Sequence, residues 1–284
     1  MLVRFNNAEL SAHSIFEHEK SLDLFRKQGF FILENRENLS PENYIELFKV
    51  KSGLGGYFQS EFNKNYHASN IKGNVSLIGQ IDKGIHPSFN TCNGQDFHVD
   101  GTFELIGTVK TSVLYCVENA DVGGESILFD ANGAFIFLEK NYPHCAVALM
   151  NEKSLVRRST TGTEDFCIGP AFKYNQNKLY TRFTIDISAC WEEAYSQIDH
   201  LEEAVNIMRD IAQPGSPYYL QFALAPQHMI VFENDTLCHG RLSYQQFNKQ
   251  RLMIRALFYD RFGDASFISQ YPIVNEQKST ELFS

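Results

Sequence analysis

Short β-type runs dominate this chain from about residue 74 onward, and they constrain its fold more than any other feature. Gly, Asn, Asp and Pro separate the runs, so that each one has room for a strand and a turn. Many short strands at this density predict a sandwich or a barrel. The runs cover residues 75–78, 111–117, 126–129, 179–185, 218–222, 229–232 and 252–259.

Helical patterns precede and interrupt these strands. Residues 21–28 form a short amphipathic helix pattern, and a strand-like run at 30–33 follows it after a glycine. Ser40 before Pro41 predicts the start of a second helix, with serine as N-cap and proline at the first helical position. A longer helix is expected over residues 191–212, where apolar side chains recur at helical spacing.

The domain organisation expected from these patterns is a single domain over residues 1–284. Residues 1–73 would supply α/β elements packed on a barrel core at 74–262, with the helical insertion near 191–212. No Ser/Gly/Pro-rich linker separates the two patterns, which favours one domain over two. The predicted fold class is therefore mainly β with flanking helices.

Composition narrows the class of protein. The 284 residues carry a formal net charge of −9, so we expect no general attraction to nucleic acid or to anionic lipid. No apolar run approaches the roughly 20 residues that span a bilayer, and the N-terminus does not resemble a secretory signal. Six scattered cysteines without a CxxC pair favour reduced thiols. We expect a cytoplasmic protein with a small-molecule partner, and leave self-association into a homo-oligomer open.

The segment His98-Val99-Asp100 is the first candidate for chemistry. Residues i and i+2 of a strand point to the same face, so the imidazole and the carboxylate would converge. Together they are two thirds of a facial triad, which holds non-haem Fe(II) and leaves positions open for O₂ chemistry. An H-x-D sequence also arises easily by chance, so a third ligand is needed.

His239 is the best candidate for that third ligand. It follows a β-type run and an Asn-Asp turn, which would place it at a strand start beside a cavity. Arg251 and Arg255 come 12 and 16 residues later, on one face of a strand-like run between apolar residues. Two inward-facing guanidinium groups are costly unless they meet anions, and binding of a carboxylate is the usual remedy. Two arginines on a solvated face are the alternative.

Gly123-Gly124-Glu125-Ser126 reads as a turn that leads into the next strand. The hydroxyl of Ser126 could then bond to a bound carboxylate. The chain contains no GxGxxG nucleotide loop, no G-x-S-x-G elbow and no H-E-x-x-H zinc helix.

The remaining histidines have no ligand partner at a useful spacing, and we expect them to be structural or exposed. His67 alone is kept as a candidate substrate contact. These residues are His13, His18, His67, His86, His144, His200 and His228.

Together these motifs resemble the taurine dioxygenase family of Fe(II)/2-oxoglutarate-dependent oxygenases. The family pattern is H-x-D, a G-G-[DE]-T turn, then a distal His and an Arg in the last core strands. In this chain Ser126 stands in place of the usual Thr, and Phe97 in place of the common Trp. The resemblance covers most of the chain, down to the Gly-Phe strand that begins at Gly29 and the helix after Ser40.

The resemblance implies a double-stranded β-helix, the jelly-roll barrel, with iron near one mouth. It implies that His98, Asp100 and His239 ligate Fe(II), and that Arg251 with Ser126 holds the distal carboxylate of 2-oxoglutarate. Arg255 would lie deeper, against the cosubstrate or an anionic group of the substrate. By the same resemblance Gly101 and Phe103 would be substrate walls.

The implied activity is that of an oxidoreductase. It is a dioxygenase that uses O₂ and 2-oxoglutarate to oxidise, most simply to hydroxylate, an unactivated C–H of a small, anionic or amino-acid-like substrate. Succinate and CO₂ are the coproducts. A desaturase or another oxidative tailoring enzyme of the same family is the nearest alternative. A cupin-like metal barrel without oxygenase activity is the alternative from another class, and the arginine pair argues against it. Halogenases of this type lack the carboxylate that Asp100 supplies.

Overall fold

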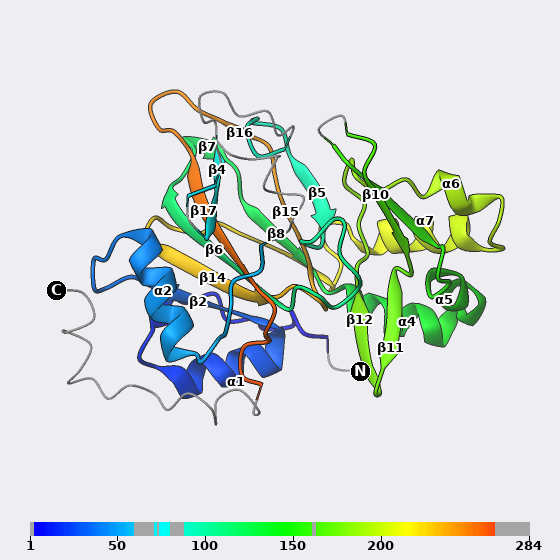
Figure 1. The fold of residues 1–284 in the computed structure, drawn as a ribbon, viewed down its shortest axis with the longest axis horizontal. Helices are drawn as coiled ribbons and strands as arrows, with labels where there is room; N and C mark the ends of the chain where they lie inside the picture. Colours follow the sequence, from blue (N-terminus) through cyan, green and yellow to red (C-terminus); the bar gives the residue numbers. More distant parts are fainter. Residues whose placement is uncertain (1–2, 60–70, 73, 80–87, 161–162, 265–284) are drawn as a thin grey trace.

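The computed structural model describes residues 3–59, 71–72, 74–79, 88–160 and 163–264. Within these residues the strands form one seven-stranded sheet, one four-stranded sheet and three two-stranded ribbons (Figure 1). Among the described helices, none has the length and apolar character needed to cross a membrane. The protein is thus mainly β with flanking helices, as the sequence predicts.

The seven-stranded sheet is antiparallel except for the first pair, β1 and β2. Its central strands are long and almost continuously apolar, as expected of a sheet that is covered on both faces. In spatial order the strands are β1 (His13–Ser14), β2 (Phe30–Glu34), β14 (His228–Glu233), β6 (Thr111–Glu118), β17 (Leu252–Phe258), β4 (Val75–Gly79) and β3 (Ile71–Lys72).

The four-stranded sheet is also antiparallel and holds the segments that the sequence motifs singled out. In spatial order its strands are β13 (Tyr219–Phe222), β8 (Ser126–Phe129), β15 (Cys238–Arg241) and β5 (Gln95–His98). The ribbons pair β9 (Leu155–Arg158) with β10 (Phe166–Gly169), β11 (Phe172–Asn175) with β12 (Lys178–Thr181), and β7 (Val122–Gly123) with β16 (Tyr244–Gln245).

Apolar cores on both sides of each sheet give the molecule its layers. One core joins residues of the two larger sheets, such as Phe30 and Phe232 with Leu128. A second core packs α1 (His18–Gln28) and α2 (Pro41–Lys51) on the outer face of the seven-stranded sheet. A third core packs the remaining helices against the four-stranded sheet. These helices are α4 (Ala131–Asn141), α5 (Pro143–Leu149), α6 (Glu192–Tyr195) and α7 (Leu201–Ile211).

Most of the expected elements are present. The hydroxyl of Ser40 accepts a hydrogen bond from the backbone N–H of Asn43, and Pro41 is the first residue of α2, as its capping sequence predicts. Gly29 ends α1 in the left-handed conformation (φ 81°), which glycine adopts without steric cost. The strand-like runs at 75–78, 111–117, 126–129, 218–222, 229–232 and 252–259 all contain strands within a residue or two of the expected bounds.

Two expectations about elements are wrong. The single helix over residues 191–212 is two helices, because His200 takes a left-handed conformation (φ 63°) that interrupts the helical hydrogen bonds. The expected strand over 179–185 ends at Thr181. Beyond that point the backbone bonds to other groups: the N–H of Phe183 donates to the Thr181 hydroxyl, and the carbonyl of Thr184 accepts from the indole of Trp191.

Candidate functional site

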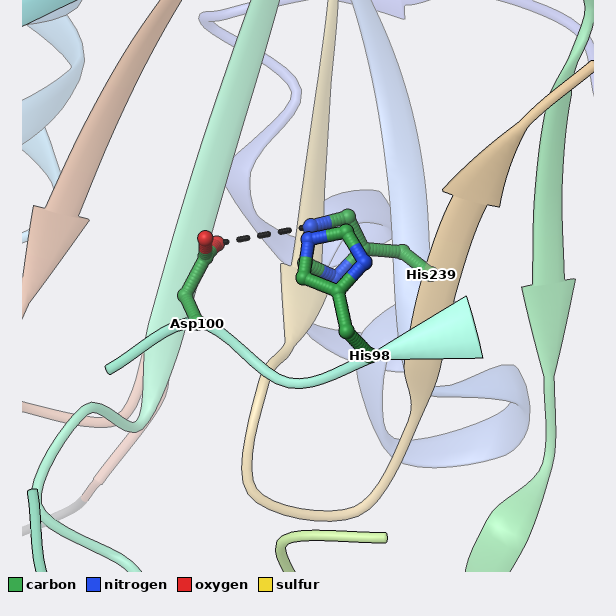
Figure 2. Close-up of side chains that lie close together, drawn as sticks. All are labelled: His98, Asp100 and His239. Carbon is green, nitrogen blue, oxygen red and sulfur yellow. Dashed lines mark ion pairs between the residues drawn. The ribbon is translucent and has the colours of Figure 1, made fainter. Parts of the chain in front are cut away.

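Three of the predicted side chains lie together at one end of the four-stranded sheet. His98 is the last residue of β5 and His239 the second of β15, and the two are direct partners across these antiparallel strands. Their ring centroids are 4.2 Å apart. Asp100 completes the group (Figure 2), and one ligand atom from each residue lies within 4.8 Å of the other two.

Asp100 reaches this position in a way that the sequence did not predict. It is not on the strand with His98, because β5 ends at His98 and the chain then turns through Gly101, whose φ is 90°. Asn234 fixes the turn: its Oδ1 accepts from the Asp100 N–H at 2.9 Å, and its Nδ2 donates to the Asp100 carbonyl at 3.2 Å. A buried amide side chain, not strand alternation, therefore aims the carboxylate.

The Asp100 carboxylate is ionised despite its burial. Burial alone would raise its pKa, but the Arg255 guanidinium, the two imidazoles and a hydrogen bond from Ser112 lower the pKa below its ordinary value. The Ser112 hydroxyl donates to Oδ2 at 2.8 Å, and Nη1 of Arg255 contacts Oδ1. Nε2 of His239 lies 3.5 Å from Oδ2.

Hydrogen bonds indicate the tautomer of His98. Its Nδ1 lies 3.0 Å from the carbonyl oxygen of Asp96, which can only accept, so Nδ1 carries a proton. Its Nε2 lies 3.2 Å from the side-chain nitrogen of Gln95, which can only donate, so Nε2 presents its lone pair. Burial and the neighbouring His98 lower the pKa of His239 to about 3, so it is uncharged at neutral pH. Two neutral imidazoles and one carboxylate are the donor set of a facial-triad iron site.

An inner cavity lies between the two larger sheets, beside the metal-ligand group. The predicted residues Ser126, Arg251 and Arg255 all line it, together with His98 and His239. Ser126 is the first residue of β8, as predicted, and Arg251 immediately precedes β17. The sequence therefore identified residues that do meet in space.

Arg251 is a buried cation that lacks an anion in the described part of the chain. It is 3% exposed, and its Nε has no hydrogen-bond partner among the residues that the structure describes. Burial, and after it the charge of Arg241, lower its pKa to about 10. Gly124 explains part of the Gly-Gly motif: its φ is 79°, and a Cβ there would lie 3.2 Å from Nε of Arg251. The arrangement leaves room for a carboxylate ligand.

Arg241 lines the same cavity and was missed by sequence reasoning. It is 6% exposed, and its Nη2 donates to the carbonyl oxygens of Ser88 and Thr91, both at 3.2 Å, and contacts that of Asn93. Its Nε has no partner among the described residues. The centroid of the Tyr244 ring lies 4.9 Å from the guanidinium carbon of Arg241 and 5.4 Å from that of Arg251. The only sequence signal was its position two residues after His239.

A second cavity opens at the mouth of the site, on the other side of the metal-ligand group. His98, Gln95, Phe89 and Arg255 line both cavities. The predicted wall residues Gly101 and Phe103 line the mouth, whereas His67 lies outside the described residues. Its lining includes aromatic side chains, cationic and hydroxyl side chains, and two carboxylates. The aromatic residues are Phe58, Phe89 and Phe103, the arginines are Arg157, Arg158 and Arg255, and the carboxylates are Asp100 and Asp186.

Arg157 under the mouth is the second residue that sequence reasoning missed. It is 1% exposed, and its Nη1 donates at 2.8 Å to the carbonyl of Val99, the central residue of the H-x-D segment. Its other bonds reach the hydroxyls of Thr102 and Ser188. Ser188 in turn donates to Asp186, whose Oδ2 is 3.9 Å from Nδ1 of His98. A buried polar network thus supports the metal-ligand segment from below.

Comparison with known proteins agrees with this geometry. Residues 5–257 match the model of the family described as taurine catabolism dioxygenase TauD, TfdA family. A uridine-5′-phosphate dioxygenase of an Amycolatopsis species is 38% identical over 235 residues, 82% of this chain and 85% of the relative. A protein of the same name from a Streptomyces species is 33% identical over 267 residues, 90% of this chain and 96% of the relative.

Solved structures share the fold at much lower identity. An asparagine oxygenase bound to Fe(II), hydroxyasparagine and succinate superposes with a TM-score of 0.61 at 14% identity, covering 84% of this chain and 78% of that one. The non-haem iron oxygenase OrfP bound to Fe and α-ketoglutaric acid gives a TM-score of 0.59 at 14% identity, covering 85% and 80%.

Proposed function

The chain belongs to the TauD/TfdA family and is an Fe(II)- and 2-oxoglutarate-dependent dioxygenase of a small molecule, and from this premise we propose that its substrate is a nucleoside 5′-phosphate. Two relatives that match most of the chain carry the name uridine-5′-phosphate dioxygenase. The observation that carries the proposal is the mouth cavity, whose lining combines three arginines and several hydroxyls with aromatic side chains. Arginine and hydroxyl side chains can bind a phosphate, and aromatic side chains can pack against a flat base.

The proposed metal ligands are His98, Asp100 and His239. Their donor atoms, protonation states and mutual distances fit a divalent iron ion. When bound, the iron and 2-oxoglutarate supply the O₂-dependent oxidation of a C–H bond, with succinate and CO₂ as coproducts. The protein holds the carboxylate through Ser112 and Arg255, and orients one imidazole through the carbonyl of Asp96.

The proposed cosubstrate site is the inner cavity. Arg251 and Ser126 would hold the distal carboxylate of 2-oxoglutarate, and Arg241 would add a second positive charge behind them. The unpartnered Nε atoms of the two arginines support this assignment, because a buried cation without an anion is unfavourable. The keto-acid end would then extend towards His98 and His239 in the same cavity.

The substrate would bind in the mouth cavity with its phosphate next to Arg255. This side chain contacts Asp100 and also lines the mouth, so an anion that it binds lies close to the metal ligands. Its Nε has no partner among the described residues. The carbon that bears the phosphate, C5′, would therefore be the one nearest the iron. The base would extend outward between Phe103 and Phe58.

Oxidation at C5′ has a defined outcome. Replacing one C5′–H by a hydroxyl leaves hydroxyl and phosphate on the same carbon. The hydroxyl proton then leaves, a C=O bond forms and the C–O bond to phosphate breaks. The products are a 5′-aldehyde and inorganic phosphate, besides succinate and CO₂. One oxygen atom of O₂ enters succinate and the other enters the aldehyde. Desaturation or hydroxylation elsewhere would release no phosphate.

The overall organisation forms part of the same proposal. The two larger sheets, which share one apolar core, would be the two halves of the jelly roll, with residues 1–284 acting as one oxygenase domain. All six cysteines are free, which suits a reducing cytoplasm. The net charge of −9 argues against nucleic-acid and membrane partners.

Succinate formation from 2-oxoglutarate tests the substrate class. Purified protein with Fe(II) is offered uridine 5′-phosphate, other nucleoside 5′-monophosphates, uridine and a panel of free amino acids. A nucleoside 5′-monophosphate should stimulate succinate formation far above the rate without substrate, and uridine should not. Stimulation by an amino acid instead would contradict the nucleotide assignment and favour the amino-acid-like substrate expected from sequence.

A matched pair of variants links the substrate to the mouth. Arg255→Gln should raise the apparent KM of the nucleotide more than that of 2-oxoglutarate. Arg26→Gln, on the exposed end of α1, is the control and should change neither. Equal losses for both ligands in Arg255→Gln would show that this arginine serves only the metal-ligand carboxylate.

A further inference from the structure

A second group of metal-ligating side chains lies on the outer surface, away from both cavities. His144 is on α5, His200 immediately precedes α7 and Glu203 is in the first turn of α7. Oε2 of Glu203 is shared: it lies 3.1 Å from Nδ1 of His200 and 3.5 Å from Nε2 of His144. Both histidines are exposed, as expected from the sequence, but the structure brings them together with a carboxylate that sequence spacing did not reveal.

The geometry of this group is suited to one cation. One ligand atom from each residue lies within 4.8 Å of the other two, the same limit that the buried His98 group satisfies. The two imidazole centroids are 4.5 Å apart, with ring planes at 63°. The side chains are 45–53% exposed, so water has access to complete the coordination of an ion.

Packing of the two helices fixes these positions. Residues next to the ligands, such as Cys145 on α5 and Leu201 on α7, are fully buried in one apolar core. His200 has a φ of 63°, in the left-handed region that few residues other than Gly, Asn, Asp and His adopt. This conformation sets its imidazole beside the first turn of α7. The ligand distances therefore rest on rigid backbone, not on a long loop.

The shared carboxylate oxygen of Glu203 is the acidic donor of the group, because it faces both imidazoles. The available donors are thus two imidazole nitrogens and one carboxylate oxygen.

We propose that His144, His200 and Glu203 form a second metal site, which binds a divalent cation of the zinc class and ties α5 to α7. Two imidazoles and one carboxylate suit Zn²⁺, Co²⁺ or Ni²⁺ and do not suit Mg²⁺ or Ca²⁺, which prefer oxygen ligands. The role is structural, because none of the three residues lines either cavity. The two helices belong to the core behind the four-stranded sheet, so the ion would stabilise the layer that supports β8 and β15.

Zinc stoichiometry in a two-by-two set of variants tests the site. Zn²⁺ also fits the His98 group, so both sites must be separated in one experiment. Equilibrium dialysis of metal-free protein against Zn²⁺ should give two ions per chain for the wild type and one each for His144→Ala and His239→Ala. The double variant should bind none. A wild-type chain that binds one ion, or a His144→Ala chain that binds as many as the wild type, would overturn the proposal.

Thermal denaturation supplies a readout that does not depend on enzyme activity. In the His239→Ala background, Zn²⁺ should raise the Tm, because it binds the folded state alone. The rise should disappear with Glu203→Gln, which keeps the shape of the side chain and removes its charge. It should persist with His228→Asn, a control at a histidine outside the group. An equal rise in Glu203→Gln would show that zinc acts elsewhere.

Discussion

Replacing Arg251 by methionine should separate binding of 2-oxoglutarate from stability. A guanidinium–carboxylate pair at about 4 Å is worth ~4 kcal/mol at an effective dielectric constant of about 20. Arg241 contacts the same Tyr244 ring and lines the same cavity, so it would retain part of this attraction. We therefore expect a loss of about 2–4 kcal/mol, which is a rise in Kd of roughly 30- to 1000-fold.

Stability should change in the opposite direction. The pKa of Arg251 falls to about 10 because burial and Arg241 disfavour its charged form. The ordinary pKa of arginine is 12.5, so the shift corresponds to ~3 kcal/mol by which the folded state disfavours the charged guanidinium. At pH 7, below the pKa of both the folded and the unfolded state, this destabilisation is fully present. Methionine retains the apolar stem and removes the charge. The free energy of unfolding without ligand should therefore rise by about 1–3 kcal/mol.

Anaerobic calorimetric titration of 2-oxoglutarate into Fe(II)-loaded protein measures the first effect, and urea denaturation of the ligand-free protein measures the second. Arg251→Lys should recover only part of the affinity, because a point charge does not reproduce the planar fork. Arg26→Met, at an exposed arginine, is the control and should alter neither quantity. Unchanged affinity in Arg251→Met would refute the reasoning, whatever its stability.

Three further predictions concern metal binding and the stability of the fold. His239→Ala should lose Fe(II) binding in equilibrium dialysis, because two ligands hold the ion weakly; retained iron would contradict the assignment. Arg157→Met should lower the free energy of unfolding by about 3 kcal/mol in urea, since it removes the buried donor of the Val99 carbonyl and the hydrogen bonds to Ser188. Burial lowers the pKa of His13, so the folded state disfavours its protonation. The contribution of His13 to the free energy of unfolding is therefore complete above about pH 6.5 and is lost as the pH falls below that value. His13→Gln should flatten this pH dependence, and an unchanged slope would contradict the prediction.

Residue patterns in the sequence predicted several residues of the candidate site, but not the hydrogen bonds that position them. His98, Ser126 and His239 lie at strand ends, where periodic apolar runs and turn residues make the position of a side chain readable. Asp100 was expected on the strand beside His98. It reaches the same point because Asn234, 134 residues away in sequence, holds the turn.

The contributions of Arg241 and Arg157 could not be read from the sequence. Their hydrogen-bond partners are backbone carbonyls and hydroxyls from distant segments, and these leave no pattern of residue types. The break before α7 was hidden for a related reason. His200 takes the left-handed conformation, which histidine adopts only occasionally, and residues 191–212 contain no glycine or proline to indicate an interruption. The same break brings His200 next to His144.

The ratio of inorganic phosphate to succinate tests the central claim most directly. Wild-type protein with Fe(II), O₂, 2-oxoglutarate and uridine 5′-phosphate should form the two products in a one-to-one ratio, and His239→Ala should form neither. This ratio follows from oxidation of the carbon that bears the phosphate, at the metal site formed by His98, Asp100 and His239. Substrate-stimulated succinate without phosphate, or phosphate release that persists in His239→Ala, would contradict the account.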